Sequence, residues 1–226
     1  MNKSPGLRST VVIAFALCLF LGMMLTPPSG DSPAELLQSL REHSAEAYWT
    51  GLFRFLTSLL VVPVLLAIAP SIRHRGSVPF RVAAVSLYVG SLCGVVVFTL
   101  MVMQNAVLAP MPNQESALAV AEALESSLLL LIPSIVYLVG LLIGFLLLGV
   151  SLWLAGIGRL VATAVSIGLA VHIAGGDWIV TSLSGALILS GGITMVGLRL
   201  VRGGDRRQRT QPVADPVRHL VSDEPR

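Results

Sequence analysis

Long uninterrupted runs of apolar residues dominate the pattern along the chain. A bilayer core about 30 Å thick needs roughly 20 consecutive apolar residues of helix to cross it. The runs that meet or approach this length cover residues 10–26, 51–69, 82–103, 128–148, 154–174 and 178–198. No alternation of apolar and polar residues with a period of two competes with a helical interpretation. Because backbone polar groups in lipid must be satisfied within the segment, the pattern predicts six transmembrane helices.

Composition narrows the class of protein further. Hydrophobic residues make up 54% of the 226 residues and charged residues only 12%, whereas an ordinary soluble domain carries about 25% charged residues. This excludes a conventional soluble enzyme, a disordered chain and a nucleic-acid-binding domain. The two cysteines, Cys18 and Cys93, are too few for a disulfide scaffold. We therefore expect an all-α membrane protein, with a six-helix transmembrane domain over residues 1–202 and a disordered cytoplasmic tail over 203–226.

The first apolar run has two possible interpretations. It begins after Lys3 and Arg8, as the apolar part of a secretory signal peptide would. The run is followed by Thr26, Pro27 and Pro28, which do not form the small-x-small cleavage site of such a peptide. We expect a retained membrane helix, and cleavage stays an open alternative.

Charge sorting predicts the orientation. Lysine and arginine concentrate in the cytoplasmic loops of membrane proteins. With six spans and both termini in the cytoplasm, 13 of the 15 basic residues lie on the cytoplasmic side, and the exceptions are Arg41 and Arg54. Eight of the 12 acidic residues lie on the opposite side. The net charge of +3 therefore reflects topology and does not point to a nucleic-acid partner.

Both predicted outer loops contain helix-forming segments. In the first, Ser32, Pro33 and Glu35 stand where a helix start places its cap, its first residue and its third residue. This predicts a short outer helix that runs toward Tyr48 and then either turns or continues into the second span. The second loop has an alanine-rich helical stretch over residues 115–125.

Polar residues gather at the predicted outer ends of the spans. A possible outer polar cluster comprises Arg54, His172, Asp177, Glu122, Glu125, Gln104 and Asn105. Such a cluster could bind a small anion or polar solute, or Arg54 could pair with one of the acids and lock helix ends together. No ionisable residue falls at the predicted middle of the membrane, which argues against a proton pump built on a buried carboxylate.

Other chemistries lack their motifs. The chain has no H-E-x-x-H, P-loop or dinucleotide-binding sequence, and its two cysteines are too separated for a redox pair. We therefore expect no catalytic residues, no metal site and no cofactor. Two G-x-x-x-G pairs, Gly90 with Gly94 and Gly140 with Gly144, allow close helix packing, either within the bundle or between copies of the chain.

One segment carries a family resemblance. Tyr48-Trp49-Thr50-Gly51-Leu52-Phe53-Arg54, placed after a polar outer helix and before an apolar span, resembles small six-pass bacterial membrane proteins of families described only as domains of unknown function. The similarity covers most of residues 10–200 and implies no activity. The single lysine against fourteen arginines agrees with a bacterial, GC-rich source, and hence with a multi-pass protein of the bacterial plasma membrane.

Two functions remain open at this level. The first is a non-catalytic accessory or structural component of the plasma membrane, with membrane lipids and an unidentified protein or second copy as partners. The alternative is a small-solute or ion transporter with a shallow polar site at the outer face. A water-filled cavity between Arg54 and His172 would favour transport, and a dry bundle with paired charges would favour the first.

Overall fold

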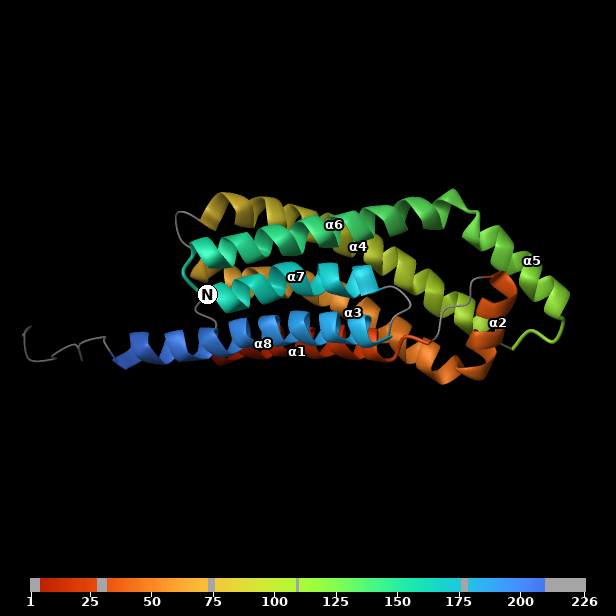
Figure 1. Ribbon diagram of the computed structural model, residues 1–226, viewed down its shortest axis with the longest axis horizontal. Helices are drawn as coiled ribbons and strands as arrows, with labels where there is room; N and C mark the ends of the chain where they lie inside the picture. Colours follow the sequence, from red (N-terminus) through yellow and green to blue (C-terminus); the bar gives the residue numbers. More distant parts are fainter. Residues whose placement is uncertain (1–4, 28–31, 73–75, 109, 176–178, 210–226) are drawn as a thin grey trace, which may run out of the picture.

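The computed structural model describes residues 5–27, 32–72, 76–108, 110–175 and 179–209, and these are helical with short connections (Figure 1). The elements in chain order are α1 (Pro5–Met24), α2 (Pro33–Glu42), α3 (Ser44–Ile68), η1 (Ala69–Ser71), α4 (Ser77–Leu108), α5 (Gln114–Glu125), α6 (Leu128–Leu154), α7 (Arg159–Gly175) and α8 (Ile179–Arg209). The all-α class is confirmed for this part of the chain.

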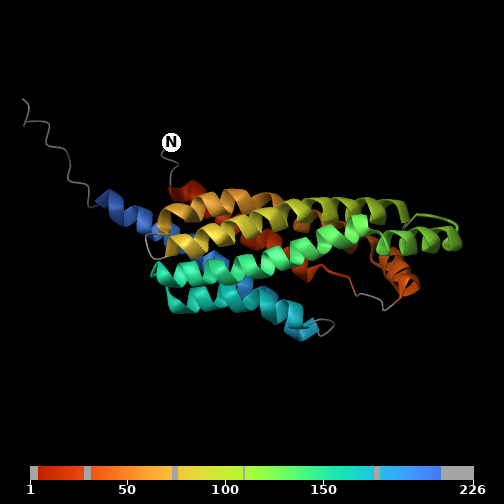
Figure 2. The ribbon, with the colours of Figure 1, turned by 90° about the horizontal axis from the view of Figure 1, so that it is seen from above.

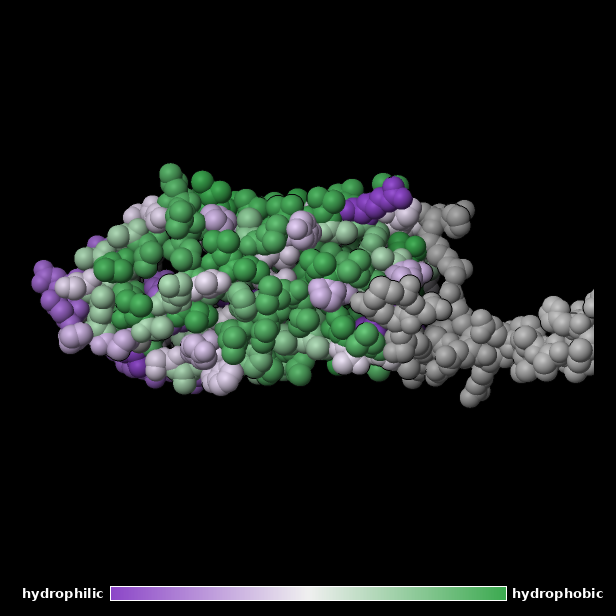
Figure 3. Space-filling model, turned by 180° about the vertical axis from the view of Figure 1, so that it is seen from behind, coloured by the Kyte–Doolittle hydropathy of each residue, from purple (hydrophilic) through white to green (hydrophobic). Residues whose placement is uncertain are grey.

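Each of the six apolar runs forms a helix, and in the part of the chain that the structure describes four of these are long and apolar enough to cross a membrane. They comprise most of α1, α3 with η1, α4 and α6. The described apolar parts of α7 and α8, Arg159–Ile173 and Leu183–Arg199, are shorter. On the face shown in Figure 3, apolar side chains cover the middle of the molecule, and hydrophilic ones gather at the end formed by α2 and α5, on the left. This surface is typical of a protein surrounded by lipid.

The six long helices close a ring in chain order. Contacts join α1 to α3, α3 to α4, α4 to α6, α6 to α7, α7 to α8, and α8 back to α1. Helices α2 and α5 pack on each other at one end of this ring (Figures 1 and 2), hereafter the α2–α5 end. The opposite end holds the connection between α6 and α7, hereafter the turn end.

Glycines bring α4 and α6 together inside this ring. A Cβ atom on Gly140 would lie 2.9 Å from the Cα atom of Gly90, and a Cβ atom on Gly94 would lie 2.7 Å from the ring of Tyr137. The two G-x-x-x-G pairs therefore face each other's helices within one chain. Of the two alternatives for these glycines, internal packing is the one that the structure shows.

The connection between α6 and α7 corrects the predicted start of the fifth span. The amide of Gly156 donates to Trp153 O and that of Ile157 donates to Leu152 O, which is the pattern of a Schellman helix end. Gly156 has a φ of 75°, a conformation that costs glycine little. As a result Arg159 is the first residue of α7, and does not lie inside a helix that starts at residue 154.

At the α2–α5 end, helix α2 begins at the cap that the sequence predicts. Ser32 accepts a hydrogen bond from the amide of Glu35 at 3.3 Å, and α2 then ends at Glu42 before a turn at His43. The turn therefore comes at His43, before Tyr48, where the sequence predicted either a turn or a continuation. Tyr48 itself lies in α3, which continues through the second apolar run. Leu37 of α2 is buried beside Leu108 and two alanines of α5.

The other end of the chain differs from the predicted boundary at residue 202. Helix α8 continues to Arg209 and so includes residues 203–209, which the composition assigned to a disordered tail. The low hydropathy of this segment means that it buries little surface, but it does not prevent a helix. Arginine and glutamine have high helix propensity, and adding residues to an existing helix costs little. Residues 210–226 of the predicted tail lie outside the described residues.

Candidate functional site: a cavity inside the helix ring

A cavity of about 480 Å³ lies inside the ring, in its half toward the α2–α5 end. Five of the six ring helices or their ends contribute to its wall, and the lining residues are Leu19, Met23, Thr26, Arg54, Thr57, Val97, Phe98, Met101, Ser134, Tyr137, Leu138, Leu141, Leu169, His172 and Ile173. Most of this wall is apolar, with a few polar side chains, which is the usual composition of a small-molecule site. The cavity reaches Leu141, the midpoint of α6.

Arg54 fixes one wall of this cavity by bonding to the end of α1. Its Nε–H donates to Gly22 O at 3.1 Å, and one of its terminal nitrogens donates to Thr26 Oγ1 at 2.7 Å. Gly22 makes room for this, since a Cβ atom there would lie 3.1 Å from Cγ of Arg54. The cation thus satisfies a carbonyl in the last turn of α1, where positive charge is favourable.

The positive charge of Arg54 has no carboxylate partner among the described residues. Its described polar partners are the Gly22 carbonyl and the Thr26 hydroxyl. Guanidinium has N–H donors beyond the two used here, and Arg54 lines the cavity. The interpretation that Arg54 pairs with an outer acid therefore finds no support in the described carboxylates.

An aromatic pair lies under Arg54. The rings of Phe98 and Tyr137 pack edge to face at 5.0 Å and 90°, and the guanidinium carbon of Arg54 lies 5.9 Å from the centre of the Phe98 ring. Such a position allows a cation–π attraction. Gly94 makes the arrangement possible, because any Cβ atom there would collide with the Tyr137 ring.

His172 lies in the last turn of α7 and lines the same cavity. A Cβ atom on Gly185 would collide with the His172 backbone. Helix α8 therefore packs closely behind this residue. The imidazole is half-buried. The structure thus places Arg54 and His172, which the sequence grouped together, on the wall of one cavity.

The cavity is closed at its floor and open at its mouth. Thr57, Phe98 and Leu169 on the floor are only 8%, 3% and 3% exposed. At the mouth, Leu138 of α6 is 48% exposed and Ile173 of α7 is 38% exposed. Helices α6 and α7 diverge toward the α2–α5 end in both ribbon views (Figures 1 and 2). The two exposed lining residues stand on these two helices, so the cavity is least covered between α6 and α7.

Of the other residues of the predicted outer cluster, those whose side chains the structure describes do not line this cavity. Asn105 lines a separate pocket of about 380 Å³ together with Arg41 and Tyr48. Glu122 is exposed on α5, and Gln104 is half-buried on α4. The side chain of Glu125 and all of Asp177 lie outside the described residues.

The outer polar cluster predicted from the sequence omits several cavity residues, because they lie within the apolar spans and not at their ends. Ser134 and Tyr137 lie three positions apart in α6, and Arg54 and Thr57 are spaced in the same way in α3. Residues three apart share a helix face. Polar residues at this spacing within otherwise apolar spans could have predicted a polar stripe that faces the interior of the bundle.

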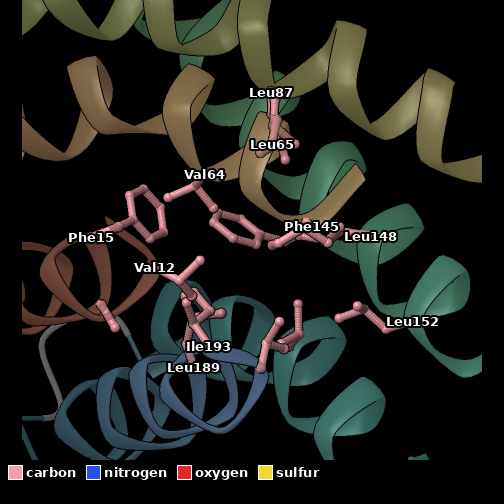
Figure 4. Packing of buried hydrophobic residues seen from close by; sticks show 14 of the residues in the cluster. Val12, Phe15, Val64, Leu65, Leu87, Phe145, Leu148, Leu152, Leu189 and Ile193 are labelled. Atoms are coloured by element: carbon pink, nitrogen blue, oxygen red, sulfur yellow. The ribbon is translucent and has the colours of Figure 1, made fainter. Parts of the chain in front are cut away.

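The half of the ring toward the turn end has a different interior. Side chains from all six ring helices fill it (Figure 4) and leave a void of about 10 Å³, which is about the volume that one water probe occupies. Phe15 and Phe145 pack there with ring centres 6.5 Å apart. The residues that line this packed region, hereafter the plug, are Phe15, Val61, Val64, Leu65, Ile68, Leu87, Phe145, Leu148, Leu152, Val165, Ile193 and Val196. The axis is therefore open in one half and closed in the other.

The cavity offers positive charge, hydrogen-bond donors and apolar surface. The described residues contain no group of three or more histidine, cysteine or acidic side chains placed to hold a metal ion. The chemistry present suits recognition of a small anion with an apolar body. Comparison of the chain with known proteins finds no matching family model, no matching curated protein and no matching solved structure.

Proposed function

We propose that the chain is a six-pass protein of the bacterial plasma membrane, with both termini in the cytoplasm and the α2–α5 end outside. Charge distribution supports this orientation. The acidic side chains that the structure describes lie on α2, the first turn of α3 and α5, whereas Arg8, Arg81, Arg159 and Arg199 lie toward the turn end. Basic residues favour the cytoplasmic side. Helix α7, with 17 residues, is about 26 Å long, which nearly matches a bilayer core.

Within this topology, the proposed function is transport of a small organic anion that enters from the outer face. One observation carries the proposal: the cavity of about 480 Å³ presents an arginine with no described carboxylate partner and also contacts His172. A charge held in an apolar surrounding is costly, so an anionic ligand would supply the missing counter-charge. A cavity between Arg54 and His172 supports transport over a purely structural role.

The wall indicates the kind of anion. A carboxylate could accept from the free N–H groups of Arg54, and charge-assisted bonds of this kind are among the stronger polar contacts. The apolar side chains of Leu141, Met101 and Leu169 would contact a hydrocarbon body. We therefore favour a small monocarboxylate with an apolar part over an inorganic ion. No catalytic residue is part of this proposal.

The plug fits a transporter that is open to one side. A solute in the cavity reaches the middle of α6 and meets the packed side chains of the plug. Passage to the other side then requires a second conformation in which the plug opens and the mouth closes. The structure corresponds, in this proposal, to the outward-open state.

A structural role is the competing function, and one observation favours it. Arg54 ties α1 to α3 through Gly22 and Thr26, so it stabilises the bundle whether or not a ligand binds. In that case the cavity would be a gap left by packing, and the protein would be a non-catalytic component of the membrane. The two functions differ in whether ligand binding depends on Arg54.

The test is a thermal stability screen of the purified full-length protein in detergent against a panel of small monocarboxylates. A ligand present at about 100 times its Kd stabilises the folded state by about 2.7 kcal/mol. We expect a stabilising monocarboxylate for the wild type and none for Arg54→Gln. The matched control is Arg41→Gln, because Arg41 also donates to a backbone carbonyl, Met111 O, at 2.9 Å but does not line the cavity.

Two results would overturn the proposal. One is the absence of any stabilising anion in the panel, and the other is equal stabilisation of the wild type and a folded Arg54→Gln variant. Uptake of the identified ligand into proteoliposomes then separates transport from binding alone. Binding without uptake would leave a receptor or sensor and would contradict transport.

A further inference from the structure

A second surface with unbalanced positive charge lies at the turn end, away from the cavity. A groove of about 280 Å³ runs between the end of α6 and the start of α7, and its wall includes Val150, Trp153, Arg159, Thr163 and Ile167. Trp153 is 55% exposed, and Arg159 and Thr163 are exposed. The groove therefore combines an apolar floor, an accessible indole ring and a cation.

Arg199 adds a second cation beside this groove. A Cβ atom on Gly158 would lie 3.0 Å from the guanidinium carbon of Arg199, so that guanidinium packs directly against the turn that precedes Arg159. Among the described residues, neither arginine has a carboxylate or hydrogen-bond partner. Two like charges near one turn repel each other, and an anion bound there would relieve the repulsion.

The backbone at the start of α7 also favours an anion. The first turn of α7 contains no acidic residue, and the residue before it, Gly158, has no side chain that could cap the free amides. The first amides of a helix attract anions. This effect adds to that of the two arginines.

The apolar floor decides between a lipid and a free anion. Val150 and Ile167 are 39% and 48% exposed and line the groove on helices whose outer faces would contact lipid. A dissolved phosphate would make no apolar contacts with this floor, whereas an acyl chain would cover it. Tryptophan also prefers the headgroup level of a bilayer.

We propose that the groove between α6 and α7 at the turn end is a binding site for an anionic phospholipid of the leaflet at that end. Its phosphate lies between Arg159 and Arg199 at the start of α7, Trp153 contacts the headgroup region, and an acyl chain lies on Val150 and Ile167. The site is separate from the cavity of Arg54, and it shares with the proposed function only the placement of the bundle in a membrane.

The test counts lipids that remain bound to the full-length protein in native mass spectrometry. The protein is exchanged into mixed micelles that contain equal amounts of phosphatidylglycerol and phosphatidylcholine. We expect preferential retention of phosphatidylglycerol by the wild type. Arg159→Gln and Arg199→Gln should each lower this preference about fivefold, since a basic residue near an anionic surface contributes roughly 1 kcal/mol. Arg159→Lys should keep most of it.

The control is Arg81→Gln, because Arg81 is also exposed and lies near the start of α4 at the same end, but it neither lines the groove, as Arg159 does, nor packs against Gly158, as Arg199 does. Thermal unfolding of each variant in lipid-free detergent confirms that it folds. The inference fails if the wild type shows no preference, if Arg81→Gln lowers it as much as the Arg159 and Arg199 variants do, or if inorganic phosphate displaces the bound lipid. Monocarboxylate binding should be unchanged in all three glutamine variants, which separates this result from the outcome for the cavity.

Discussion

The two halves of the helix ring are built from the same helices, yet their interiors differ. In the plug, every ring helix contributes large apolar side chains, and a void of about 10 Å³ remains. In the other half, the same ring surrounds a cavity of about 480 Å³ that contains Arg54 and His172. Average hydropathy cannot produce this difference, because both halves are apolar overall.

A close contact between α6 and α7 explains why these two helices leave no space in one half. A Cβ atom on Gly149 of α6 would collide with Ser166 of α7. This contact draws α6 and α7 together beside the plug. Toward the α2–α5 end, α6 and α7 separate (Figures 1 and 2), and Arg54 turns its guanidinium to α1, which leaves the interior between them unfilled.

The largest expected effect comes from removing a plug side chain. Phe145 is 2% exposed, and Phe145→Ala should lower the free energy of unfolding by about 3–5 kcal/mol because it leaves an empty space in a packed region. Unfolding by SDS in mixed micelles measures this. The control is Leu146→Ala, whose side chain is 41% exposed and should change stability by no more than about 1 kcal/mol. Equal losses for the two variants would contradict a packed plug.

Enlarging a side chain should change stability differently in the two halves, and by less than Phe145→Ala does. Val165 is fully buried in the plug, so Val165→Phe should cost about 1–3 kcal/mol through overpacking. Leu141 borders the cavity, so Leu141→Phe has space to occupy and should cost less than about 1 kcal/mol, while it weakens monocarboxylate binding. The same unfolding assay compares them, and a larger cost for Leu141→Phe would mean that the cavity is filled.

The smallest effect is expected at Arg54. Arg54→Met removes charge-assisted bonds to Gly22 and Thr26, each worth about 1.5–3 kcal/mol, and also removes the cost of holding a charge away from water. These terms offset each other, so stability without ligand should change by about 1 kcal/mol or less in the SDS assay. A loss as large as that of Phe145→Ala would identify Arg54 as chiefly a structural residue and would favour the competing function.

Local features of the fold were predictable because their causes are local. Ser32 caps α2 as expected, and the alanine-rich stretch forms α5. The boundaries were less accurate. Helix α3 begins at Ser44, whereas the predicted span begins at residue 51. Hydropathy marks the apolar part of a helix, but polar turns continue the same helix beyond it.

The candidate site was only partly predictable. Proximity to helix ends singled out Arg54 and His172, which share the cavity, but it also singled out Glu122 and Asn105, which lie elsewhere. Tyr137 contributes to the same wall but lies within an apolar span, away from the helix ends. Depth along a helix can be estimated from sequence position, whereas the direction in which a side chain faces depends on how the helices are arranged around the ring.

The sequence by itself determined that the chain forms apolar helices, where their caps lie and how the charges are sorted between the two ends, because each depends on residues near one another in the chain. Only the tertiary structure decided that six helices close a ring, that Gly90 meets Gly140, and that a plug lies beside an open cavity. A cavity is a property of several helices at once. Its volume depends on the separation between helices, which small residues on different helices set together and which no single segment encodes.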